Sequence, residues 1–448
     1  MAYDTSTRIA IVGGGCWGLS TAYHLEKAGY TDITVFDRSS ELPSPQSAAN
    51  DLNKIVRAQY ADDFYTGLGL EAIAEWKQGD WAPYFHQTGH LVMLSGYAGE
   101  KAQGIFEDAA ICSQTNASLS PHISELDSPE EIRQCCWQLT GDLAHFRGYL
   151  NRSEGYASSA DAVKGISAKL AKRGIRFVLG PDKGLVKNLV YAGDGRRCTG
   201  VRTRDGTTHS FELVVCALGA YGASLVPKLG QFCVARCWSV AHVQLTVEEC
   251  TILRGIPIVN AIDLGFFFEP DPETCLLKIT PLGAGYSNFS GTTQTNTSLP
   301  PLASGDIGQN KALSGYIPEA DEAQMRRLLH QTLPWLADRP FVHKKMCWFS
   351  DTVDSEYCID FVPNTDRSLV VLSGDSGHGF KMMCIFGKWV RELLESGRQK
   401  HARWTWRKGP GDSQGADWGG NVSWRFGEAS ETGDIVKERE ARTAKSSS

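Results

Sequence analysis

The hydrophobic pattern at the start of the chain predicts a β-strand, an amphipathic helix and a second β-strand. Residues 8–12 form a short apolar run that leads into a glycine-rich turn. After the turn, apolar residues recur at the spacing of one helix face, at Leu19, Ala22, Leu25 and Ala28. Gly29 then ends the helix, and residues 33–37 read as the next strand. This order predicts a complete βαβ unit.

The remainder of the chain alternates between helical and extended patterns. Helical spacing begins at about Ser158 and recurs over residues 316–333 and before Leu394. Strands are predicted over residues 176–179, 186–190, 200–204, 212–218, 264–269, 276–280 and 369–373. Residues 408–448 are polar, Gly-rich and charged, so we expect an extended or disordered tail. The pattern as a whole indicates an α/β protein.

Composition fits a globular protein of two or three domains and argues against several classes of function. The chain has 448 residues, of which 42% are hydrophobic and 21% charged, with a net charge of −6. This mild acidity argues against a nucleic-acid surface, and no apolar stretch is long enough to cross a bilayer. The 13 cysteines include no Cys-x-x-Cys pair, so no metal site is expected. The polar start and the ending Ser446-Ser447-Ser448, which is not a peroxisomal tripeptide, lead us to expect a cytosolic protein.

The strongest single motif is Gly13-x-Gly15-x-x-Gly18, which lies between the first strand and the helix, with Asp37 at the tip of the second strand. Gly13 allows the tight turn, Gly15 lets backbone amides approach a pyrophosphate, and Gly18 lets helix and strand pack closely. Asp37 would accept hydrogen bonds from an adenosine ribose, which favours FAD or NAD over NADP. The alternative is a glycine-rich structural turn.

Two further strand–glycine segments favour FAD over NAD. Residues 214–219 end in Gly219, and a similar segment ends near Gly374. A cofactor that is contacted from three distant parts of the chain suits the long, extended FAD molecule.

The chain resembles the monomeric sarcosine oxidase group, and within it the amadoriases (fructosyl amino acid oxidases) and the saccharopine and pipecolate oxidases. Four segments carry the resemblance, which spans roughly residues 8–400: the glycine motif with Asp37, residues 47–57, residues 265–286 and residues 347–381. The resemblance implies a monomeric FAD-dependent amine oxidase with a discontinuous, Rossmann-type FAD-binding domain (residues 1–90, 150–225 and 345–400). A mainly β substrate-binding domain (residues 91–149 and 226–344) and a polar C-terminal tail (residues 401–448) complete the expected fold.

The resemblance also implies which residues hold the cofactor. Cys347 matches the cysteine that forms a thioether with the flavin 8-methyl group, and a buried structural thiol is the alternative. The loop around His378 is expected against the pyrimidine end of the flavin. The full set of expected cofactor-binding residues is Gly13, Gly15, Cys16, Trp17, Gly18, Asp37, Arg38, Ser47, Lys54, Gly219, Cys347, Gly377, His378, Gly379 and Lys381.

Catalytic and substrate-binding roles follow from the same resemblance. A lysine inside an apolar strand, such as Lys278, is costly unless it is paired or hydrated. The resemblance places Lys278 beside the flavin, where its charge would assist the reduction of oxygen, and Lys54 near the ring. Arg57 and Lys381 match the residues that bind the substrate carboxylate, and Tyr60 is a candidate wall of the substrate cavity. The alternatives are surface ion pairs, a strand-edge lysine and core packing.

Leu282 departs from the amadoriase pattern, in which a glutamate at this position contacts the sugar. Leucine cannot satisfy a sugar hydroxyl, and an unpaired buried hydroxyl costs on the order of 1–3 kcal/mol. The resemblance implies an FAD-dependent oxidase that converts a secondary amine to an imine and reduces O2 to hydrogen peroxide, and Leu282 argues against a fructosyl substrate. The expected substrate is an N-methyl or N-alkyl amino acid, saccharopine or pipecolate. A fructosyl amino acid oxidase, a flavin dehydrogenase with a protein electron acceptor and a non-catalytic flavin-binding protein are the alternatives.

Overall fold

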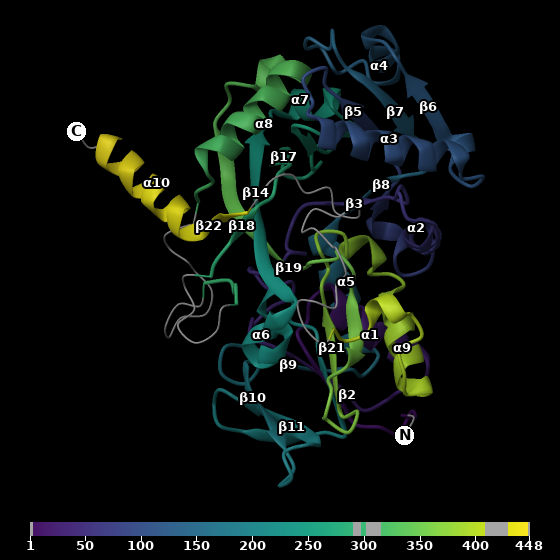
Figure 1. Ribbon diagram of the computed structural model, residues 1–448, viewed down its shortest axis with the longest axis vertical. Helices are drawn as coiled ribbons and strands as arrows, with labels where there is room; N and C mark the ends of the chain where they lie inside the picture. The colour runs from purple at the N-terminus through teal and green to yellow at the C-terminus, as the bar shows by residue number, and fades with distance from the viewer. Residues whose placement is uncertain (1–2, 290–296, 302–314, 408–428, 447–448) are drawn as a thin grey trace.

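The computed structural model describes residues 3–289, 297–301, 315–407 and 429–446 (Figure 1). Its first sheet has the strand order β20-β21-β13-β1-β2-β9, with parallel pairing throughout except for β20. The strands of this sheet are β1 Ile9–Val12, β2 Ile33–Asp37, β9 Arg176–Leu179, β13 Leu213–Cys216, β20 Cys358–Phe361 and β21 Leu369–Ser373. They come from three distant parts of the chain, and the α/β fold class is confirmed.

The N-terminal βαβ unit forms as the sequence predicts. Helix α1 spans Cys16–Lys27 between β1 and β2. Gly13 has a positive φ of 111°, and a Cβ there would lie 2.3 Å from the carbonyl oxygen of Ala217. A Cβ on Gly18 would lie 1.9 Å from the carbonyl oxygen of Gly13, so only glycine lets α1 pack this close to the turn.

A second, larger sheet lies beside the first and has the strand order β22-β18-β14-β17-β16-β15-β5-β7-β6, with β19 paired to β14. Its strands are β5 His90–Leu94, β6 Ile123–Leu126, β7 Arg147–Asn151, β14 Cys233–Gln244, β15 Ile258–Ala261, β16 Gly265–Phe267, β17 Leu276–Pro281, β18 Tyr286–Ser287, β19 Phe341–Thr352 and β22 Ser430–Glu431. The expected domain boundary at residue 345 falls inside β19, which pairs with β14 from Phe341 to Thr352.

Two small sheets and the helices complete the described fold. One small sheet contains β3 Lys54–Val56, β8 Gly155–Ala157 and β4 Phe85–His86. The other contains β10 Val186–Tyr191, β11 Cys198–Thr203 and β12 Thr208–Ser210. The other helices are α2 Asp63–Trp76, α3 Glu100–Thr115, α4 Pro129–Cys135, α5 Ser159–Lys172, α6 Gly222–Leu225, α7 Val247–Ile252, α8 Glu319–Thr332, α9 Phe386–Ser396 and α10 Thr432–Ser446. In the part of the chain that the structure describes, no helix combines the length and apolarity needed to cross a membrane.

Helix α8 begins three residues later than the sequence pattern predicts. The expected start was at residue 316, but Pro318 occupies the position before the first helical residue, Glu319. A proline disfavours helical geometry in the residue that precedes it, so the helix cannot extend back over residues 316 and 317.

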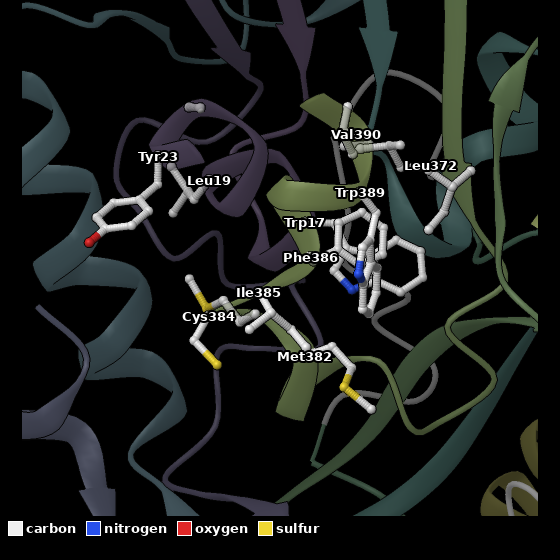
Figure 2. Close-up of a cluster of buried hydrophobic side chains, with 14 of the residues drawn as sticks. Trp17, Leu19, Tyr23, Leu372, Met382, Cys384, Ile385, Phe386, Trp389 and Val390 are labelled. Atoms are coloured by element: carbon white, nitrogen blue, oxygen red, sulfur yellow. The ribbon is translucent and has the colours of Figure 1, made fainter. Parts of the chain in front are cut away.

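The packing of α9 on α1 brings together two segments that lie more than 350 residues apart in the sequence (Figure 2). The rings of Trp17 and Phe386 stack with 4.1 Å between their centroids, and a Cβ on Gly387 would lie 2.1 Å from the carbonyl oxygen of Ser20. The Trp17 Nε1–H also donates to the carbonyl oxygen of Gly379 at 3.3 Å. This packing holds the loop before α9 against the glycine-rich turn.

An extended or disordered tail was expected over residues 408–448. The structure instead has β22 and α10 over residues 430–446, and residues 408–428 lie outside the described part. Strand β22 pairs with the edge strand β18, and Glu431 accepts hydrogen bonds from the Ser287 hydroxyl and the Phe289 N–H. Glu438 of α10 accepts from the Tyr316 hydroxyl. The polar composition therefore belongs to a helix that docks through hydrogen bonds, the Arg442–Glu319 ion pair and the buried side chain of Ile435.

Candidate functional site

A cavity of about 590 Å³ is lined by residues of both large sheets and of the loops that join them. Seventeen of the residues singled out from the sequence line it: Gly13, Gly15, Cys16, Trp17, Asp37, Arg38, Ser47, Lys54, Arg57, Gly219, Lys278, Leu282, Cys347, Gly377, His378, Gly379 and Lys381. Gly18 and Tyr60 are not among the lining residues. Gly18 serves the helix–turn packing described above, and Tyr60 lies buried behind the wall.

The glycine-rich turn forms a cradle that fits the pyrophosphate and ribose of FAD. Helix α1 starts at this turn without a side-chain cap, so its first N–H groups are available to an anion. A Cβ on Gly15 would meet nothing closer than the Ser47 hydroxyl at 3.9 Å, so this position borders open space within the cavity. Asp37 accepts a hydrogen bond from the Gly14 N–H at 2.9 Å, which fixes its carboxylate at the rim of the same cradle.

The buried Asp51 carboxylate lies near the ammonium groups of three lysines behind the cavity wall. Its Oδ2 lies 2.6 Å from the Lys278 Nζ and 2.8 Å from the Lys54 Nζ, and its Oδ1 lies 3.8 Å from the Lys345 Nζ. Burial raises the pKa of Asp51, but the three ammonium charges outweigh this effect and hold the pKa well below its usual range. Asp51 is thus a carboxylate that compensates the buried positive charge.

Lys278 is held rigidly by this arrangement. Its ammonium also donates to the Asn53 carbonyl oxygen at 2.7 Å and lies 4.9 Å from the centroid of the Phe268 ring. Burial lowers the pKa of Lys278 to about 8, against the opposing charge of Asp51. The strand-edge alternative is wrong, because only 2% of this residue is exposed to solvent.

Cys347 and Lys54 face each other across the cavity wall. The Lys54 Nζ lies 3.8 Å from the Cys347 Sγ, and the thiol lies 3.9 Å from the Ala48 carbonyl oxygen. Burial lowers the pKa of Lys54, but the charge of Asp51 and the nearby Cys347 more than offset this, so its pKa is raised.

Arg57 directly follows β3, Lys381 lies in the short turn before α9, and both approach the Tyr60 ring. The Arg57 Cζ lies 4.2 Å and the Lys381 Nζ 5.6 Å from its centroid. Each of the two cations is 5% exposed, so the surface ion-pair alternative is wrong. Burial and the charge of Arg57 lower the pKa of Lys381 well below its usual value. A bound anion would relieve this repulsion.

His378 lines the cavity, but protein groups engage both nitrogens of its ring. Its Nε2 lies 2.9 Å from the Ser355 carbonyl oxygen, and its Nδ1 lies 3.0 Å from the Tyr357 hydroxyl and 3.4 Å from the Tyr60 hydroxyl. Burial and the charge of Lys381 lower the pKa of His378 well below its usual value. This ring therefore organises the loop, with Nε2 as donor and Nδ1 as acceptor.

Sequence reasoning missed two carboxylates of the site, Asp51 and Asp375. Asp375 lines the cavity and accepts hydrogen bonds from the backbone N–H groups of Ser350 and Gly377, and burial raises its pKa to about 6. For Asp51 the only local signal was its spacing of three residues from Lys54. The partner that matters most, Lys278, lies 227 positions further along the chain and comes close only in the fold.

Leu282, the position at which the sequence departs from the amadoriase pattern, lies in the cavity wall. The residue is 7% exposed and lines the cavity together with Phe266 and Phe268. Its backbone carbonyl oxygen accepts from the Gln324 side chain at 2.8 Å, which fixes the strand end. The wall at this point is therefore apolar.

Comparisons with known proteins agree with this geometry. The family model described as FAD dependent oxidoreductase matches residues 8–393. The chain is 32% identical over 415 residues to L-saccharopine oxidase of Schizosaccharomyces pombe, an alignment that covers 90% of this chain and 94% of that protein. Amadoriase I (fructosyl amine: oxygen oxidoreductase) of Aspergillus fumigatus has a solved structure that superposes with a TM-score of 0.83, at 31% identity and 97% coverage of both chains. Amadoriase II (fructosamine oxidase) of the same fungus, solved in complex with FSA, also gives 0.83, at 29% identity and 97% coverage of both chains. The family expected from the sequence is thus confirmed, and the chain belongs to the FAD dependent oxidoreductases.

Proposed function

We propose that this protein is an oxidase of secondary amines on amino-acid-like substrates. The observation that carries the proposal is the pair of buried cations, Arg57 and Lys381, which line the same cavity as the cofactor cradle, Lys278 and Cys347. An arginine fork and a lysine together suit a carboxylate. A substrate held by its carboxylate presents a fixed C–H and amine to the cofactor, and such positioning supplies much of the rate of an enzyme.

The six-stranded sheet and the turn after β1 would hold FAD, with Gly15 and the start of α1 at the pyrophosphate and Asp37 at the ribose. When bound, FAD would supply the two-electron chemistry, in which the amine loses a hydride and a proton to become an imine and O2 is reduced to H2O2. The chain contributes the binding and the electrostatics. The two cations disfavour the protonated amine, so the substrate binds as the neutral amine that can lose hydride.

Lys278 is proposed to assist the reduction of oxygen. Its ammonium, fixed by Asp51 and the Asn53 carbonyl, places a positive charge at the cavity wall where negative charge would develop on oxygen. Lys54, bound to the same carboxylate, adds a second charge beside it.

The substrate class follows from the apolar wall at Leu282 and from the relatives. L-saccharopine oxidase supports an N-alkylated amino acid, whereas the amadoriase structures support a fructosyl amine. Leu282 offers no polar atom to a sugar, so we propose that saccharopine-type, N-alkyl or cyclic secondary amino acids are preferred.

A peroxide-coupled screen of purified protein in air tests the proposed function. The panel contains sarcosine, N-alkyl amino acids, saccharopine, pipecolate and fructosyl amino acids. We expect peroxide with at least one of the non-sugar amines, and we expect the Leu282→Glu variant to gain activity on fructosyl amino acids relative to wild type.

Three other outcomes of the screen would contradict parts of the proposal. Anaerobic bleaching of the flavin without peroxide in air would show a dehydrogenase. No bleaching with any amine would favour a flavin-binding protein without this activity. A wild-type preference for fructosyl substrates would overturn the interpretation of Leu282.

We further propose that Cys347 carries the flavin covalently, because its Sγ lines the cavity 3.8 Å from the Lys54 ammonium. The bond would join Sγ to the 8-methyl carbon of FAD, with loss of one hydrogen from each, and the two protons and two electrons released would reduce O2 to H2O2. Acid-precipitated, washed wild-type protein is expected to stay yellow, and Cys347→Ser is expected to release its flavin into the supernatant. Cys16→Ser, which alters another cysteine of the cavity, is the matched control and should stay yellow. A colourless wild-type pellet would refute the linkage.

A further inference from the structure

Three side chains form a continuous row across the cavity wall on the substrate side of the large sheet. Asn260 of β15 is paired in register with Phe266 of β16, which is paired with Thr280 of β17. Residues directly opposite one another on adjacent strands point to the same face, and all three line the cavity. Thr280 lies on the same face of β17 as Lys278, and Leu282 follows the end of the strand.

Both polar members of this row have an unused hydrogen-bonding atom. Asn260 is 1% exposed and Thr280 is 4% exposed. Within the described residues, neither the Asn260 Oδ1 nor the Thr280 Oγ1 has a hydrogen-bond partner. Buried polar atoms of native proteins are nearly always paired, so two such atoms on one wall of a cavity point to a ligand that completes them.

The orientation of the Asn260 amide is fixed from behind. The Asn260 Nδ2 lies 3.2 Å from the His90 Nε2, and the His90 Nδ1 lies 2.9 Å from the Glu154 Oε2. Because the carboxylate can only accept, the His90 hydrogen sits on Nδ1, and Nε2 accepts from the Asn260 amide. This leaves the Asn260 Oδ1 as an acceptor toward the cavity, which requires a donor on the ligand.

The same relay connects Asn260 to the proposed carboxylate site. The Glu154 Oε1 accepts from the backbone N–H groups of Ala58 at 2.7 Å and Gln59 at 3.1 Å, immediately after Arg57. Arg57, Asn260 and Thr280 line one cavity, so a substrate held at Arg57 through its carboxylate shares that cavity with the Asn260–Thr280 row.

We infer that Asn260 and Thr280 determine substrate specificity by binding a hydrogen-bond donor, a hydroxyl or an amine N–H, on the N-substituent of the substrate, with Phe266 packing against its carbon chain. This inference rests on the proposed function and narrows the substrate class to N-alkyl amino acids with a polar N-substituent. The Asn260 Oδ1 accepts from the donor, and the Thr280 hydroxyl can accept from or donate to the same group.

Matched substrates test the inference on the flavin-loaded enzyme. We compare N-(2-hydroxyethyl)glycine and N-(2-aminoethyl)glycine with N-propylglycine, which has nearly the same shape but no donor. Wild type is expected to favour at least one donor-bearing probe by about tenfold or more in kcat/KM. Asn260→Leu and Thr280→Val should each reduce this preference severalfold, and Thr280→Ser should retain it. The donor-bearing probe that wild type favours shows whether the row binds a hydroxyl or an amine N–H.

Thr34→Val is the matched control, because the Thr34 Oγ1 is also buried without a partner in the described structure but does not line the cavity. Anaerobic calorimetry of the same probes gives a second measurement that does not need turnover. If wild type oxidises no secondary amine, the proposed function fails. The binding affinities from calorimetry still show whether the protein prefers the donor-bearing probes over N-propylglycine, which decides the inference. The inference is overturned if wild type favours N-propylglycine, if the variants leave the preference unchanged, or if they only shift the flavin absorption spectrum.

Discussion

Replacing Arg57 by methionine is expected to lower kcat/KM for a carboxylate-bearing amine between about 30-fold and a few thousand-fold, since truncating one partner of a buried charge pair costs about 2–5 kcal/mol. The residue is 5% exposed and packs on Tyr60, so the substrate carboxylate would be left with Lys381 as its main cation. Methionine keeps much of the packing volume and removes the charge. Steady-state peroxide assays on wild type and variant give the measurement.

The control for Arg57 is a change in the substrate rather than in another residue. Converting the substrate carboxylate to an amide should reduce wild-type kcat/KM strongly and should reduce that of Arg57→Met much less, because the interaction is already lost. Equal losses in both enzymes would mean that Arg57 does not contact the carboxylate.

Replacing Asp51 by alanine is expected to lower the free energy of unfolding by about 3–5 kcal/mol, because it leaves buried ammonium groups without their counterion. The Lys278 Nζ lies 2.6 Å from this carboxylate and is 2% exposed. Urea titration followed by circular dichroism measures the change. The Asp51→Ala/Lys278→Met double variant should recover a substantial part of the loss, since it removes the charge that had become unpaired.

The pH dependence of this loss has a definite sign. Burial already lowers the pKa of Lys278 to about 8, and loss of Asp51 would lower it further. In the unfolded chain the lysine keeps its proton to about pH 10. As the pH rises toward 8, Lys278 of the folded variant becomes neutral, so the stability gap to wild type should narrow. A gap that stays constant from pH 6 to 8 would show that Lys278 is not the source of the instability.

The first βαβ unit was predictable because its signals are local. The apolar spacing of α1, the runs of β1 and β2 and the glycine motif are all encoded within residues 8–37, and the structure has β1, α1 and β2 at Ile9–Val12, Cys16–Lys27 and Ile33–Asp37. The polar segment at residues 430–446 was misread, because composition alone does not reveal that β22 and α10 dock on β18 and Tyr316.

The sequence by itself determined the α/β class, predicted the glycine-rich turn as the FAD cradle and, through its resemblance to a family, singled out seventeen of the residues that line the cavity. Only the tertiary structure decided how those residues are paired: Asp51 with Lys278, both ring nitrogens of His378 with protein groups, and Asn260 with His90 and Glu154. The reason is physical. Periodicity and turn chemistry act over a few residues, whereas the protonation and orientation of a buried polar group depend on partners that strand pairing brings from hundreds of positions away.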